Sequence, residues 1–153
     1  MIVGEYQNIA EHIPKLPEFV AADGSMGGCW HESFRIFARE NLAGNTFDIE
    51  KLKQVLDAKR QGYQQTTNVI NYLASHDRHQ LLAAASFRTL DREAAFKRAK
   101  LGAVWLVTAL GIPMLWRGEE FGQSTRHIPN QPNKLQWSLL KNQPMICWHT
   151  TNT

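Results

Sequence analysis

The chain has 153 residues, of which 43% are apolar and 20% are charged, a composition typical of a soluble globular protein. Its 17 lysines and arginines are scattered among 14 acidic residues, so the net charge of +3 does not predict a nucleic-acid-binding surface. Two cysteines without metal or disulfide spacing favour a reduced, cytoplasmic protein, with no metal and no cofactor expected. The uncharged run of residues 101–116 is too short to span a bilayer, which argues against a membrane partner.

The first quarter of the chain alternates short apolar runs with turn-forming residues. Residues 1–4 are apolar, end at Glu5 and predict at most a short strand. Residues 6–18 contain two prolines and predict a connecting loop. A second strand is expected over residues 18–23, followed by a flexible glycine-rich loop over residues 24–28.

Two helices are predicted next. The apolar spacing from Trp30 to Arg39 is that of an amphipathic helix, whose aromatic side chains are more typical of a core than of a sugar-binding platform. Asp48 is a suitable N-cap for a helix over residues 49–60. Gly62 is well placed to end that helix.

The second half repeats one unit, in which a buried strand is followed by acidic residues. Residues 66–73 are rich in β-branched side chains and lead into Ser75, His76 and Asp77. Asp91 is expected to cap a helix over residues 92–110, and residues 112–116 predict a strand. Since functional groups gather at the carboxyl ends of parallel strands, this order predicts an α/β fold with its site at that edge.

Another acidic pair follows the last predicted strand. Glu119 and Glu120 are adjacent like charges, for which we expect one solvated side chain and one tied to backbone donors or a cation. A hydrolase triad of Ser75, His76 and Asp77 is not expected, because neighbouring residues on a strand point to opposite faces. Hydrophobicity alone allows either an open α/β sheet or a barrel.

The motif Asn71-Tyr72-Leu73-Ala74-Ser75-His76-Asp77, then a helix and Gly111-Ile112-Pro113-x-x-x-x-Gly118-x-Glu120, resembles the seventh and eighth strands of the α-amylase family, glycoside hydrolase family 13. The segments Phe121-Gly122-Gln123 and Cys29-Trp30-His31-Glu32-Ser33-Phe34 are most similar to 1,4-α-glucan branching enzymes and related bacterial α-amylases. The resemblance implies a partial (β/α)8 TIM barrel, about strands five to eight, because a complete barrel needs about 250 residues.

The resemblance also implies an activity and roles for three residues. Glu5 matches the general acid at the end of the fifth strand, Asp77 matches the aspartate that stabilises the transition state, and His76 matches a residue that binds a sugar hydroxyl. The expected substrate is an α-1,4-glucan such as glycogen, starch or a maltooligosaccharide, processed by retaining double displacement. Either hydrolysis or branching fits these residues.

The chain departs from the family pattern in one respect. The nucleophile's signature, Gly-x-Arg-x-Asp, does not occur in its sequence, which predicts a truncated fragment that is inactive by itself. The alternatives are a catalytically inactive fragment that binds glucan or complements a missing half, and an unrelated open α/β domain. Residues 1–142 are expected to form the half barrel, whose unpaired edges favour self-association, and residues 143–153 an irregular tail unlike the family.

Overall fold

Four strands of the described part of the chain form one parallel sheet. The computed structural model describes residues 3–4, 16–21, 27–44, 47–86, 91–124, 128 and 134–142. The strands lie side by side in the order in which they occur in the chain. They are β1 (Val3–Gly4), β2 (Gly28–Trp30), β3 (Val69–Tyr72) and β4 (Ile112–Met114).

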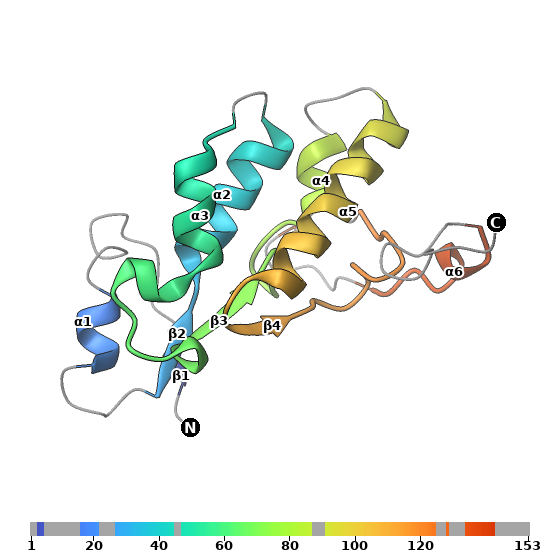
Figure 1. Ribbon diagram of the computed structural model, residues 1–153. Helices are drawn as coiled ribbons and strands as arrows, with labels where there is room; N and C mark the ends of the chain where they lie inside the picture. Colours follow the sequence, from blue (N-terminus) through green and yellow to red (C-terminus); the bar gives the residue numbers. More distant parts are fainter. Residues whose placement is uncertain are drawn as a thin grey trace.

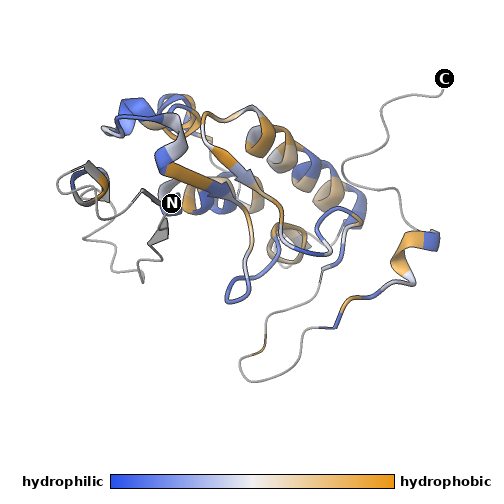
Figure 2. Cartoon of the chain, turned by 90° about the horizontal axis from the view of Figure 1, so that it is seen from below, coloured by the Kyte–Doolittle hydropathy of each residue, from blue (hydrophilic) through white to orange (hydrophobic). Residues whose placement is uncertain are grey.

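Helices connect the strands, as parallel neighbours require. The α-helices are α1 (Leu16–Ala21), α2 (Glu32–Ala43), α3 (Ile49–Leu56), α4 (Leu81–Ser86), α5 (Arg92–Thr108) and α6 (Leu139–Asn142). Two 3-10 helices, η2 (Ala58–Gln61) and η3 (Thr66–Asn68), precede β3. Helices α2 to α5 lie on one side of the sheet (Figure 1). Seen from below, the central strands include apolar segments (Figure 2). The predicted α/β class with a parallel sheet is therefore confirmed.

The main core lies among the helices α2, α3, α4 and α5 and includes Leu73, the residue that follows β3. Phe34 and Phe37 on α2 are fully buried and pack with Leu106 and Trp105 of α5, whose ring centroid lies 5.6 Å from that of Phe37. A smaller cluster joins Cys29, Val69 and Tyr63 with residues of α1 and η2. Burial of large apolar side chains on one helical face therefore holds α2 and α5 together.

The predicted helix boundaries depend on local capping, and the two predicted N-caps are confirmed. Asp48 accepts a hydrogen bond from the backbone N–H of Lys51 at 3.0 Å, and Asp91 accepts one from Glu93 at 2.9 Å. Gly62 adopts a left-handed φ of 95°, which favours glycine, although it closes η2 rather than α3. The single helix predicted over residues 49–60 is divided because α3 ends at Leu56.

Three predictions for residues 18–30 are wrong. Residues 18–21 of the segment predicted as the second strand are part of α1, because Pro17 is tolerated in a first helical turn and Val20 packs into the cluster with Tyr63. The strand instead begins at Gly28, within the predicted glycine-rich loop. A Cβ atom at Gly28 would lie 2.9 Å from the carbonyl oxygen of Asn68, so this strand requires a residue without a side chain at that position. Trp30 ends β2 and does not begin the following helix.

The remaining differences concern element ends and one short helix. The predicted strand over residues 66–73 begins with the turn η3, and the strand over 112–116 ends at Met114. The long helix begins at Arg92 as predicted and ends at Thr108. Helix α4 was not predicted, because a six-residue apolar run has no period by which a buried helix differs from a strand.

Candidate functional site

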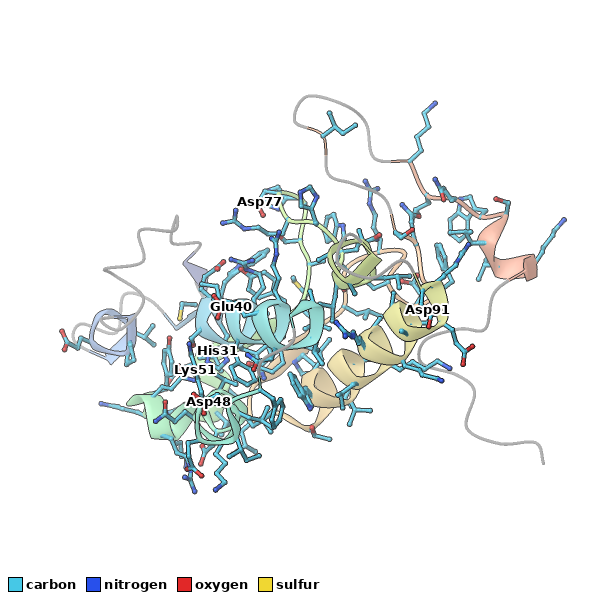
Figure 3. All side chains as sticks on the ribbon, turned by 90° about the horizontal axis from the view of Figure 1, so that it is seen from above. His31, Glu40, Asp48, Lys51, Asp77 and Asp91 are labelled. Atoms are coloured by element: carbon cyan, nitrogen blue, oxygen red, sulfur yellow. The ribbon has the colours of Figure 1, made fainter. Side chains whose placement is uncertain are left out.

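The loop after β3 carries the first candidate group. The Ser75 hydroxyl donates a hydrogen bond to Oδ1 of Asp77 at 2.5 Å, and Nε of Arg78 lies 3.8 Å from Oδ2 of Asp77. Asp77 is exposed, and Figure 3 shows it at the rim of the helical layer, away from the buried His31. The expectation that Ser75 does not act through a triad agrees with this contact, because its hydroxyl is directed to the carboxylate.

The surroundings of Asp77 favour its ionised form. Partial burial acts to raise the pKa of this carboxyl, but the hydrogen bond from Ser75 and the charges of Arg78 and His76 outweigh it. The pKa of Asp77 is therefore below its usual range. At neutral pH this side chain is a carboxylate that can accept hydrogen bonds or oppose a positive charge.

His76 lies close to two tryptophans, one from each of the two strands that flank β3. Its ring centroid is 6.3 Å from that of Trp30, at the end of β2, and 6.4 Å from that of Trp116, which follows β4. The carboxyl ends of three adjacent parallel strands therefore contribute one group each to the same edge.

A buried network lies beneath Trp30. The ring of Trp30 contacts Tyr72 edge-on with centroids 4.8 Å apart, and the Tyr72 hydroxyl donates to the carboxylate of Glu32. The same carboxylate accepts two hydrogen bonds from Arg35, at 3.0 Å and 2.6 Å. Burial, followed by the contact with Glu32, raises the pKa of Tyr72, so its hydroxyl remains a donor. The network orders the start of α2 against the end of β3.

The loop after β4 is held by its own acidic pair. Glu119 is buried and accepts a hydrogen bond from the backbone N–H of Trp116 at 3.1 Å, while Glu120 accepts one from Gly118 at 2.7 Å. Both carboxylates are thus tied to backbone donors, which corrects the expectation that one is only solvated. Gln80 connects the two loops, since its side-chain amide donates to the carbonyl oxygen of Arg117 at 3.3 Å.

Burial changes the titration of Glu119. Desolvation raises the pKa of this carboxyl to about 7, with a smaller contribution from Glu120. Hydrogen bonds from the backbone of Trp116 and Leu81 act in the opposite direction. Glu119 therefore contacts both the loop after β4 and the start of α4, the helix that follows the Asp77 loop.

The three site residues predicted from the sequence have different outcomes. The structure places Asp77 and His76 in one loop at the carboxyl edge of the sheet, whereas Glu5 lies outside the described residues. The sequence interpretation missed Trp30 and Trp116 as neighbours of His76. The sequence did contain a signal for them: a tryptophan stands at the end of β2 and another just after the end of β4.

Within the ranges that the structure describes, no group of three or more histidine, cysteine, aspartate or glutamate side chains is arranged to hold a metal ion. None of the described helices is long and apolar enough to cross a bilayer.

Comparison with known proteins identifies the family of the chain. A curated amylopullulanase from Thermoanaerobacter thermohydrosulfuricus is 28% identical over 107 residues, which is 63% of this chain but 7% of that protein. The chain thus matches only a small part of its relative's length. No solved structure matches it significantly. The family model for the α-amylase catalytic domain matches residues 1–148, and the chain therefore belongs to the α-amylase catalytic-domain family.

Proposed function

We propose that the chain is part of an α-glucan-active enzyme, an amylase-type glycoside hydrolase or a 1,4-α-glucan branching enzyme that acts by retaining double displacement. The observation that carries this proposal is the ionised Asp77 beside His76 at the carboxyl edge of a parallel sheet, in a member of the α-amylase family. A carboxylate at this position can stabilise the positive charge that develops on the sugar ring in an oxocarbenium-like transition state.

In this proposal the four strands are strands five to eight of a (β/α)8 barrel, formed by residues 1–142. The parallel order of the strands and the helices on one side of the sheet support it. Residues 143–153, the predicted irregular tail, lie outside the described residues. Glu5 follows β1, and we assign it the role of general acid; the described strand is parallel to the strand that precedes Asp77.

A second candidate function is that of a glucan-binding or complementing fragment. The nucleophile's Gly-x-Arg-x-Asp signature does not occur in these 153 residues, so no covalent glycosyl intermediate can form from them alone. In this second candidate function, Asp77 and His76 bind glucan. Turnover then requires another polypeptide segment that supplies the nucleophile.

Calorimetric titration with maltoheptaose tests the proposed function. We expect Asp77→Asn and His76→Ala each to weaken binding roughly 10- to 100-fold, the effect of losing a hydrogen bond to a charged or polar group. The matched control is Glu50→Gln, because Glu50 is an exposed side chain on α3. Equal affinity of all variants, or equal binding of cellohexaose, would contradict an α-glucan site at Asp77.

Self-association is a further part of the proposal. Among the described strands, β1 pairs only with β2 and β4 pairs only with β3, so the sheet has two edges. Such edges recruit other chains unless they are covered. Light scattering at several concentrations is expected to give a mass above that of the monomer, whereas a compact monomer with sharp thermal unfolding would favour a self-sufficient α/β domain.

A further inference from the structure

Three rings form a continuous row across the ends of three strands. Trp30 is the last residue of β2, His76 lies four residues beyond β3, and Trp116 lies two residues beyond β4. Their centroids are separated by 6.3 Å and 6.4 Å, with His76 in the middle. We refer to these three residues as the aromatic row. It runs across the strands, beside Asp77.

The exposure of the row distinguishes it from the core. Phe34 and Phe37 are completely buried, whereas Trp30 and Trp116 remain partly exposed and His76 is exposed. Indole side chains carry a large apolar area, and leaving part of it in water costs free energy unless a ligand covers it. Packing within the described chain therefore does not account for the whole surface of these rings.

Trp30 is held in place by the buried residues that it contacts. Trp30 rests against Tyr72, which is bonded to the buried pair of Glu32 and Arg35. A ring that is already positioned loses little conformational entropy on binding a ligand, which favours affinity.

Trp116 is held from its backbone and from its ring. Its backbone N–H donates to the buried carboxylate of Glu119. The guanidinium carbon of Arg117 lies 5.5 Å from the centre of its ring. These contacts fix Trp116 beside His76 without depending on a ligand.

The inclination of the rings indicates the shape of the ligand. The plane of His76 makes an angle of 86° with that of Trp30 and 58° with that of Trp116, so the row is not a flat platform. A β-1,4-linked glucan is a nearly flat ribbon and suits coplanar rings. An α-1,4-linked glucan curves, and its successive sugar rings present their apolar faces at different angles.

We infer that the aromatic row binds successive sugar rings of an α-1,4-glucan on both sides of Asp77, with Trp30 and Trp116 as stacking residues. The C–H faces of the sugars lie against the indoles, and a ring nitrogen of His76 meets a sugar hydroxyl between them. This inference rests on the proposed function and goes beyond it by assigning Trp30 and Trp116 to the substrate site.

Maltoheptaose is the probe for the first test, with calorimetric titration as the readout. Trp30→Ala and Trp116→Ala are each expected to weaken binding roughly tenfold. Trp30→Phe and Trp116→Phe, which keep a ring, should retain most of the affinity. The matched control is Trp137→Ala: Trp137 is 63% exposed and packs against Phe121 outside the row, so its removal should leave the affinity unchanged.

A second measurement covers the case in which an alanine variant does not fold, as judged by circular dichroism. Maltoheptaose should reduce acrylamide quenching of tryptophan fluorescence in the wild type and in Trp137→Phe. This protection should shrink in Trp30→Phe and in Trp116→Phe, because each variant lacks one indole of the row. An undiminished protection in both of these variants would overturn the assignment.

The outcomes separate this inference from the proposed function. If Asp77→Asn weakens binding and the tryptophan variants do not, the row is not part of the site although the chain binds α-glucan. If the wild type does not bind maltoheptaose, both the proposed function and the row fail. Equal affinity for cellohexaose, a β-1,4-glucan, would show that the inclined rings of the aromatic row do not select a curved α-1,4-glucan.

Discussion

The carboxylate of Glu119 accepts a hydrogen bond from the backbone N–H of Trp116, at 3.1 Å, while it is almost entirely removed from solvent. One buried acidic group thus fixes the residue that ends the row of rings at the edge of the sheet. The burial of the same carboxyl determines how the protein is expected to respond to pH.

Acidification is expected to relieve the cost of burying Glu119. Its pKa is raised from 4.5 to about 7 in the folded protein, so the folded state binds the proton more tightly than the unfolded state. Its contribution to the free energy of unfolding should therefore fall by roughly 3 kcal/mol as the pH rises from about 4.5 to about 7. Urea unfolding of the wild type and of Glu119→Gln across this range isolates the effect.

The control for this measurement is Glu40→Gln on the exposed face of α2. The lowered pKa values of His31 and Asp77 act in the opposite direction, but they are common to both proteins and cancel in the difference. If the wild type and Glu119→Gln respond identically to pH, Glu119 does not titrate as described.

The buried ion pair of Glu32 and Arg35 is expected to be costly to break from one side. Oε2 of Glu32 and Nη2 of Arg35 are 2.6 Å apart, and both side chains are 7% exposed. Arg35→Met leaves an uncompensated buried carboxylate and should destabilise the protein by about 3 to 5 kcal/mol. The double variant Glu32→Gln/Arg35→Met should recover much of this loss.

An exposed pair of the same spacing provides the comparison. Lys53 and Glu50 are 2.7 Å apart, but their side chains are 52% and 72% exposed. Lys53→Met should change the free energy of unfolding by less than about 0.5 kcal/mol. A loss of similar size at Arg35 and at Lys53 in chemical denaturation would show that burial does not govern the first pair.

Gly111 is expected to tolerate no side chain. Its φ is 153°, and a Cβ atom there would lie 2.5 Å from Nδ2 of Asn71. Gly111→Ala should therefore destabilise the protein by about 1 to 3 kcal/mol, measured by thermal unfolding. In a double-mutant cycle, Gly111→Ala/Asn71→Ala should cost less than the sum of the single variants, because the alanine at position 71 removes the closest steric contact, while that with Cγ2 of Val69 at 2.9 Å remains. Strict additivity would contradict this explanation.

The 153 residues by themselves are expected to turn over no glucan. Their sequence lacks the nucleophile signature, and losing one essential carboxylate reduces turnover by a factor of about 10⁴ to 10⁶. Reducing-end formation and loss of iodine staining with amylose measure hydrolysis and branching. Robust turnover that Asp77→Asn abolishes would show that another side chain replaces the nucleophile.

The sequence determined the features that depend on neighbours along the chain. The caps at Asp48 and Asp91 and the left-handed Gly62 follow from contacts within a few residues, and each is recognisable as a residue type at a position. The acidic residues that follow two apolar segments in the sequence likewise lie in the loops after β3 and β4, at the carboxyl edge of the sheet.

Only the tertiary structure decided the features that depend on residues distant in sequence. Residues 18–23 have the composition of a strand, but packing of Val20 against Tyr63 favours the helix α1. Trp30, predicted to lie on a helix, becomes a neighbour of His76 because β2 pairs with β3, and Trp116 reaches the same place because β3 pairs with β4. Such pairings arise from strand register across tens of residues, and local propensity carries no information about them.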